Sequence, residues 1–175
     1  MKLKTCAVVC VSFLILASQL SAFDGQRKGF ILGGGIGGGY LSYHEPFDFS
    51  LNKAALATNF KIGYAPSNTF EVFYTNNISW FGYGSGTFAI GASCIAVTKY
   101  TKPEGKGLFI TGGLGWAAFM RVDRDTGTES GFGAFLGLGH DIAKHWYIQA
   151  DVLYTNLESS WYSWGFRVTL NVLAF

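Results

Sequence analysis

The sequence predicts an all-β fold, namely a single eight-stranded antiparallel up-and-down barrel that crosses a membrane. Two observations lead to this prediction. From residue 29 onward, eight short segments alternate between apolar and polar side chains with the period of two that a β-strand imposes. Aromatic residues make up 17% of the chain and charged residues only 14%, whereas about 25% charged residues is typical of soluble domains.

The first 22 residues have the pattern of an export signal that is cleaved. Lys2 and Lys4 precede an apolar run from residue 7 to residue 17, and Leu20-Ser21-Ala22 supplies the cleavage site. The apolar run is shorter than the ~20 residues that a spanning helix needs, which disfavours a retained membrane anchor. We therefore expect a signal peptide at residues 1–22 and a barrel domain at residues 23–175.

Charge and cysteine content exclude several classes of protein. The chain carries 13 Lys and Arg and 11 Asp and Glu, so loss of Lys2 and Lys4 leaves equal numbers of basic and acidic residues. It has no run of basic residues that would suggest nucleic-acid binding. Because Cys6 and Cys10 lie in the predicted signal, the exported chain retains Cys94 alone and cannot form an intramolecular disulfide.

Turn residues bound the first four predicted strands. Residues 29–43 form the first strand, since Tyr40-Leu41-Ser42-Tyr43 continues the preceding glycine run as a strand. Residues 54–64 form the second strand, which the turn sequence Ala65-Pro66-Ser67-Asn68 ends. The third strand spans residues 69–79 and the fourth spans residues 87–100. The third strand sets Phe70, Val72 and Tyr74 on one face against Glu71, Phe73 and Thr75 on the other.

The last four predicted strands span residues 107–120, 130–140, 145–155 and 161–175. The seventh alternates most clearly, with Trp146, Ile148, Ala150, Val152 and Tyr154 opposed to Tyr147, Gln149, Asp151 and Leu153. We expect the faces rich in glycine and polar residues to line a narrow lumen, and the larger apolar faces to contact lipid. A soluble lipocalin-like barrel would have the reverse arrangement.

Aromatic residues recur near both ends of the predicted strands, as expected for belts at two membrane interfaces. If both chain ends lie in the periplasm, odd-numbered strands run outward. The predicted girdle residues are Tyr64, Phe70, Trp80, Tyr100, Trp116, Trp146, Tyr154 and Trp164, with Phe109 also expected near the periplasmic rim.

Residues 131–154 resemble the small bacterial outer-membrane barrels of the OmpA/OmpX type. They comprise a strand with alternating glycines from Gly131 to Gly139, the short turn Asp141-Ile142-Ala143-Lys144, and a strand that ends in Asp151-Val152-Leu153-Tyr154. The resemblance implies a barrel in the outer membrane of a Gram-negative cell, surrounded by outer-membrane lipid and lipopolysaccharide. It also implies a barrel-assembly machinery that recognises a terminal aromatic residue.

Phe175 matches that assembly signal by its place at the end of the chain. Counting back by twos from Phe175 reaches Leu173 and then Asn171, which belongs to the polar face. We therefore expect either a β-bulge near Val172-Leu173 or a Phe175 that frays from the sheet.

Four charged residues fall on the predicted inward faces: Lys61, Glu71, Asp151 and Arg167. A hairpin centred on Pro66 would set Lys61 opposite Glu71, and one centred on Ser159 would set Asp151 opposite Arg167. Because an unpaired charge in a narrow lumen is costly, we expect ion pairs in a closed core. A gate or a narrow polar path is the alternative.

The sequence indicates a structural or surface-exposed role without catalysis, metal or cofactor. A narrow porin-like channel for ions or small solutes is the main alternative. An adhesin and a lipid A-modifying enzyme rank behind it. The adhesin would use the outer loops, led by Phe47, Phe49, Trp80, Phe81 and Tyr83.

Three further motifs do not support an active site or a ligand site. His44 lies near Ser42 and Glu45, but the His-x-Ser pair of a deacylase is absent. The glycine run at residues 33–39 is not followed by the helix of a dinucleotide site. Asp123, Asp125 and Glu129 miss the spacing of a calcium loop.

Overall fold

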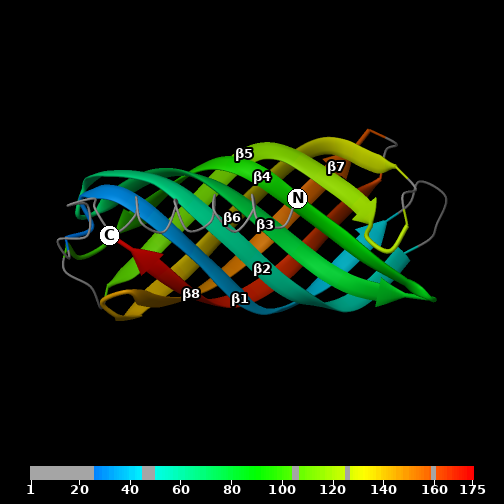
Figure 1. Cartoon of the computed structure of the whole chain (residues 1–175), viewed down its shortest axis with the longest axis horizontal. Helices are drawn as coiled ribbons and strands as arrows, with labels where there is room; N and C mark the ends of the chain where they lie inside the picture. Colours follow the sequence, from blue (N-terminus) through cyan, green and yellow to red (C-terminus); the bar gives the residue numbers. More distant parts are fainter. Residues whose placement is uncertain (1–25, 45–49, 104–106, 125–126, 159–160) are drawn as a thin grey trace, which may run out of the picture.

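A computed structural model describes residues 26–44, 50–103, 107–124, 127–158 and 161–175. In these residues eight strands form one closed antiparallel barrel, in which β1 pairs with β8 and all other neighbours are consecutive (Figure 1). The strands are β1 (Gly29–His44), β2 (Ser50–Ser67), β3 (Phe70–Tyr83), β4 (Gly86–Tyr100), β5 (Leu108–Arg121), β6 (Thr128–Ala143), β7 (Trp146–Leu157) and β8 (Tyr162–Ala174). The predicted signal peptide at residues 1–22 lies outside the described residues.

The structure confirms the all-β class and all eight predicted strands, but most strands are longer than predicted. β2 begins at Ser50 and not at residue 54, and β3 continues to Tyr83, which leaves only Gly84 and Ser85 between β3 and β4. Backbone N–H and C=O groups pair along the ladder whether or not the side chains are apolar. Polar segments that look like loops in the sequence therefore join the sheet.

The two ends of the barrel differ in what they carry. We call the end where β1 begins and β8 finishes the terminal end, and it also holds the β2–β3, β4–β5 and β6–β7 connections. The opposite end, which holds the other four connections, is the loop end. Figure 1 shows the strands inclined to the long axis of the barrel, with the C-terminus at the terminal end.

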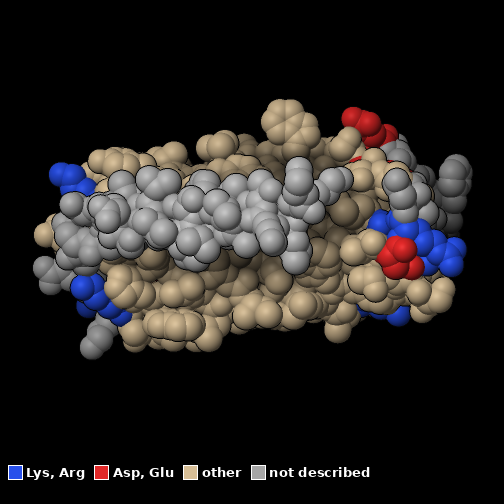
Figure 2. Space-filling model, viewed as in Figure 1, with Lys and Arg blue, Asp and Glu red and all other residues tan. Residues whose placement is uncertain are grey.

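Side chains alternate between the lumen and the outside, as predicted. In β8, Thr169 and Asn171 are fully buried, whereas Val168, Leu170 and Val172 are more than two-fifths exposed. On the visible face, Lys, Arg, Asp and Glu side chains gather at the two ends and the wall between them carries other residues (Figure 2). Many of the exposed side chains of the wall are large and apolar, among them Ile95, Leu114 and Leu136. A wall of this kind with charged rims is the surface that a lipid bilayer covers.

Glycines on the inward face of β1 allow the barrel to close. A Cβ at Gly33 would lie 2.6 Å from the carbonyl oxygen of Val172, and a Cβ at Gly37 would overlap that of Val168. Gly35 leaves space for the side chain of Asn171, which a Cβ would displace. The glycine run at residues 33–39 therefore lies at the β1–β8 seam, where the two backbones approach closely.

Candidate functional site

A network of buried charges occupies the terminal end of the lumen. The Arg27 guanidinium donates to Asp141 Oδ2 at 2.7 Å, and its Nε lies 3.6 Å from Glu71 Oε1. Lys61 Nζ donates to Glu71 Oε2 at 2.5 Å, and the Tyr100 hydroxyl donates to Glu71 Oε1 at 3.0 Å. All five residues are buried. Two cations thus face two carboxylates, which balances the charge of this layer.

Aromatic rings surround this network and fill the rest of the terminal end. The Arg27 guanidinium carbon lies 3.5 Å from the centroid of the Tyr100 ring and 5.6 Å from that of Phe175. Phe109 packs between Tyr100 and Tyr147, with centroids 5.0 Å and 5.4 Å away. We call Arg27, Tyr100, Phe109, Tyr147 and Phe175 the terminal plug. Its tilted and edge-on ring contacts and its cation–π contacts leave the terminal mouth filled by side chains.

The middle of the lumen is polar and tightly packed. Arg167 Nε donates to Asp151 Oδ1 at 2.7 Å, and Gln149 donates to Asp151 Oδ2 at 2.9 Å. Across β1, Asn59 of β2 donates to Asn171 Oδ1 of β8 at 2.7 Å. A cavity of about 10 Å³ remains beside these groups, which is close to the minimum that a single water needs.

Aromatic side chains also fill the loop end of the lumen. Tyr43 stacks on Phe119 at 5.5 Å and meets Trp161 edge-on at 5.3 Å. Phe88 lies between Phe119 and Phe81, with centroids 5.8 Å and 5.9 Å away. We call these five residues the loop-end plug. A polar middle layer is therefore enclosed between two aromatic plugs.

The structure brings both predicted ion pairs together, but only one in the predicted register. Asp151 lies directly opposite Arg167, as predicted. The prediction that Lys61 lies opposite Glu71 is wrong, because Lys61 faces Thr75 and only its long side chain reaches the carboxylate. Pro66 has no N–H to donate to β3, and the register shifts between Tyr64 and Ser67.

Arg27 and Asp141 belong to the buried network, yet neither was among the predicted lumen residues. Asp141 was assigned to a turn, whereas β6 continues to Ala143 and keeps Asp141 on the inward face with Gly137 and Gly139. Arg27 lies an even number of residues before Ile31, so both side chains fall on the inward face. Extending the alternation two residues beyond each predicted strand would have found both.

Most of the predicted girdle residues lie on the outer wall. Tyr64, Trp146, Tyr154 and Trp164 are exposed. Phe70 and Trp80 are half-buried there. Trp116 is 77% exposed but is a correction, because it pairs with Ser93 at the centre of β4 and does not lie near a rim. Tyr100 is a correction, together with Phe109, because both side chains point into the lumen and are 3% exposed. Tyr100 shares the parity of Thr98 and Ala96, so it follows the inward face of β4.

Neither expected arrangement of Phe175 is correct. The register of β8 against β1 and β7 runs without a shift through Leu173 and Val172. Phe175 does not fray, since it is 5% exposed and its ring lies 4.8 Å from that of His145. The inward alternation therefore continues past Asn171, and its last two members, Leu173 and Phe175, are apolar because they pack in the buried apolar cluster at the terminal end.

The loop end carries two polar contacts outside the lumen. The Ser42 hydroxyl lies 2.9 Å from His44 Nε2, but Ser42 is only 4% exposed and the His44 ring stacks on Tyr162. Arg121 forms two hydrogen bonds of 2.9 Å with Asp123, and they lower the pKa of that carboxyl to about 2. The Arg121–Asp123 pair therefore stays ionised throughout the physiological pH range.

Two features are absent from the described residues. No group of three or more His, Cys, Asp or Glu side chains is placed to hold a metal ion. No helix in this part of the chain is long and apolar enough to cross a bilayer.

Comparison with solved structures identifies the type of barrel. No family model and no curated protein matches the chain. The attachment invasion locus protein Ail of Yersinia pestis superposes with a TM-score of 0.59 at 16% identity, over 83% of this chain and 99% of Ail. Neisserial surface protein A (NspA) superposes with a TM-score of 0.58 at 10% identity, over 83% of this chain and 97% of NspA. The chain has the fold of a small outer-membrane β-barrel.

The rims of this outer-membrane barrel differ in charge. At the terminal end, the described acidic side chains Glu71 and Asp141 are buried. Among the described residues, the exposed charged side chains there are Lys28, Lys99, Lys102 and Lys144. At the loop end, basic and acidic side chains are mixed, with Arg121, Asp123 and Arg124 close in sequence. In the part of the chain that the structure describes, the terminal rim is therefore the more basic one.

Proposed function

We propose that this protein is an integral barrel of a bacterial outer membrane with a structural or surface-exposed role, and that it neither conducts nor catalyses. The observation that carries the proposal is the filled lumen. Side chains of the two plugs occupy both mouths, and the cavity beside the polar middle layer holds only about 10 Å³. A solute path would need several of these packed side chains to move together.

The positions of the exposed basic groups support an orientation of the barrel in the membrane and a set of lipid partners. We propose that the terminal end faces the periplasm, where the four exposed lysines contact lipid phosphates, and that the loop end faces lipopolysaccharide and the exterior. We further propose that residues 1–22 are removed on export. The buried ring of Phe175 suits an assembly signal that the assembly machinery reads before the barrel closes.

A non-catalytic role is supported by the surroundings of Ser42. Its hydroxyl contacts His44, but only 4% of the residue is exposed. A nucleophile must reach its substrate, and a carboxylate that orients the histidine completes such a site. None of the hydrogen bonds or ion pairs within the described residues joins His44 to a carboxylate.

The loop end is the surface through which the protein would attach to other molecules if it were an adhesin. A second structure of Ail holds the heparin analogue sucrose octasulfate, and it superposes on this chain with a TM-score of 0.57 at 15% identity. In this chain, two of the predicted adhesive residues, Phe47 and Phe49, lie outside the described residues. Phe81 is buried in the loop-end plug and Tyr83 is exposed. The mixed charge of the loop end does not favour a polyanion, so we rank attachment behind a structural role.

Planar-bilayer conductance of the refolded protein tests the proposal. A heat-dependent gel shift first confirms that the barrel has formed. We expect a silent bilayer, because both mouths are filled. Discrete current steps that change on Lys61→Ala or Asp151→Ala would instead establish the porin-like alternative with these residues in its path.

A further inference from the structure

Three polar side chains lie on the outer wall at the centres of adjacent strands. Thr58 of β2, Asn76 of β3 and Ser93 of β4 each stand six to nine residues from both ends of their strand. Their neighbours Ala57, Asn77 and Cys94 are buried in the lumen, which directs these three outward. Six residues of a strand inclined by about 40° cover about 15 Å of depth, which is the middle of the hydrocarbon layer.

The side chains of Asn76 and Ser93 form a hydrogen bond with each other, but this bond does not use all the donors and acceptors of the Asn76 amide. Trp80 Nε1 donates to Thr58 Oγ1 at 2.8 Å, and Asn76 Nδ2 donates to Ser93 Oγ at 3.2 Å. The Ser93 bond uses one of the hydrogens of the Asn76 amide. Within the described part of the chain, the Asn76 carbonyl oxygen and second N–H hydrogen have no further partner. A primary amide in hydrocarbon carries a substantial free-energy cost unless a partner supplies the missing hydrogen bonds.

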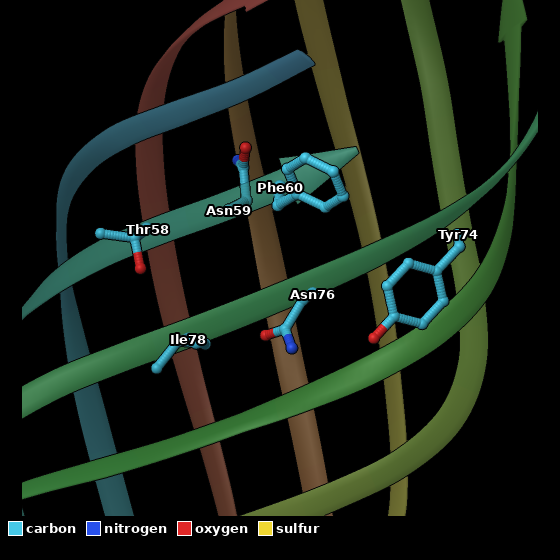
Figure 3. A pocket seen from close by; sticks show the side chains of 6 residues that line it. All are labelled: Thr58, Asn59, Phe60, Tyr74, Asn76 and Ile78. Carbon is cyan, nitrogen blue, oxygen red and sulfur yellow. The ribbon is translucent and has the colours of Figure 1, made fainter. Parts of the chain in front are cut away.

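The wall around Asn76 is hollowed on both sides. A hollow of about 380 Å³ lies between β2 and β3, where Thr58 and Phe60 face Tyr74, Asn76 and Ile78 (Figure 3). A second hollow of about 100 Å³ lies over β4 and β5, where the small residues Ala89, Gly91 and Ala118 form the floor and Trp116 stands at the edge. Small residues beside a polar group are the composition of protein contacts within membranes.

The depth of Asn76 decides what can cover this wall. An acyl chain could fill the hollows, but lipid hydrogen-bonding groups lie at the interfaces and do not reach the middle of the bilayer. Only a protein brings donors and acceptors to that depth. An amide carries both a donor and an acceptor. Two copies of Asn76 across a twofold axis can therefore supply each other's missing hydrogen bonds without any third group.

We infer that the wall formed by β2, β3, β4 and β5 is the surface through which two copies of this chain associate in the membrane, with Asn76 of each copy beside the twofold axis. An axis between β3 and β4 sets β5 of one copy, with its protruding Trp116, towards β2 of the other. The glycine and alanine floor allows the two walls to approach closely. Association of this kind needs the barrel to lie in a membrane, but it does not need the lumen to be blocked. An experiment can therefore contradict the dimer without contradicting the non-conducting lumen of the proposed function, and the reverse.

Disulfide trapping in vesicles tests the contact directly. In a background with Cys6, Cys10 and Cys94 replaced by alanine, Asn76→Cys is compared with Val152→Cys. Val152 is exposed at the centre of β7, four strands away in either direction. Each full-length variant is reconstituted in dilute phosphatidylcholine vesicles and oxidised. We expect a covalent dimer as the main product of Asn76→Cys, with Val152→Cys at the level of random collision. Equal yields, or no dimer from either variant, overturn the inference.

A second measurement avoids any change in redox chemistry. Asn76→Leu replaces the amide with a side chain that suits lipid, so the barrel should fold and keep its heat-dependent gel shift. Single-molecule photobleaching of labelled protein in vesicles counts the copies in each complex. We expect two bleaching steps for the wild type and for Val152→Leu, and a dimer dissociation constant at least tenfold higher for Asn76→Leu. An unchanged distribution for Asn76→Leu overturns the inference.

Discussion

The Arg167–Asp151 pair shows how a single residue determines the chemistry of the lumen. Both side chains are almost completely buried, and they lie opposite each other on β7 and β8. Gly39 on β1 leaves the space in which the stem of Arg167 lies, since a Cβ there would come 3.1 Å from its Cγ. Glycine on one strand thus permits a long charged side chain on the next.

Removing one partner of this ion pair should lower the free energy of unfolding far more than replacing both partners with apolar residues. Arg167→Met leaves the Asp151 carboxylate buried without its cation, which we expect to lower the free energy of unfolding by about 3–5 kcal/mol. Adding Asp151→Leu removes the uncompensated charge, and the double variant should recover most of that loss. Urea titration of tryptophan fluorescence in lipid vesicles measures both. A single variant as stable as the double variant would contradict the prediction.

At this scale, the alternation identifies which residues face the lumen but not how far it continues. Lys61, Glu71, Asp151 and Arg167 were found from their parity within strands that the sequence marks clearly. Asp141 was missed because it follows a histidine and precedes apparent turn residues, and Tyr100 was misplaced because aromatic residues near strand ends also form girdles. The contact of Arg27 with Asp141 joins residues 114 positions apart, which no local pattern contains.

At the scale of the elements, the β1–β8 seam depends on the inward glycines of β1. Gly37→Val would drive a branched side chain into the carbonyl of Val168 on β8. We expect a loss of stability at or above the upper end of the roughly 1–3 kcal/mol that overpacking costs. The heat-dependent gel shift after refolding should disappear, because the last pair of strands cannot close.

Gly38→Val is the matched control for this seam. Gly38 lies next in sequence but points outward, and a Cβ there meets only the carbonyl oxygen of Ala55, at 3.9 Å. The Gly38 variant should therefore refold with a normal gel shift. If both variants refold equally well, the seam does not limit closure.

The elements themselves were largely predictable, whereas one register was not. Period-two alternation identified all eight strands because each has one lipid-facing side. The β2–β3 pairing escaped prediction because the chain continues through Pro66 and turns later, with a register shift that alternation alone does not show. Strand lengths were underestimated for a related reason, since polar ends pair through their backbones.

For the whole molecule, the two plugs and the polar layer are successive barriers to water and ions along the lumen. Water that enters one mouth still meets the second plug, so opening one end should not create a path. We expect Arg27→Ala with Phe175→Ala, or Phe88→Ala with Phe119→Ala, to leave planar bilayers silent. All four substitutions together should give ion currents, because water from both ends can then solvate the polar middle. Currents from either pair alone would show that one plug carries the whole barrier.

The plugs could not be predicted from the sequence because their members come from distant strands. Tyr43, Phe88, Phe119 and Trp161 belong to or adjoin four different strands and meet only when the inclined sheet closes. Alternation shows that each of the strand residues points inward. It does not show that their rings lie at the same height in the barrel.

The glycines of the β1–β8 seam also bear on how such a chain can change over evolutionary time. On the lipid side, one apolar side chain can replace another with little effect on folding, so these positions are free to drift. At Gly33, Gly35, Gly37 and Gly39, any mutation meets the backbone or side chains of the facing strand. Selection should therefore hold these four positions while most of the wall diverges. Wide divergence of the wall is then compatible with one fold, and the 16% identity between this chain and Ail is an example of such divergence.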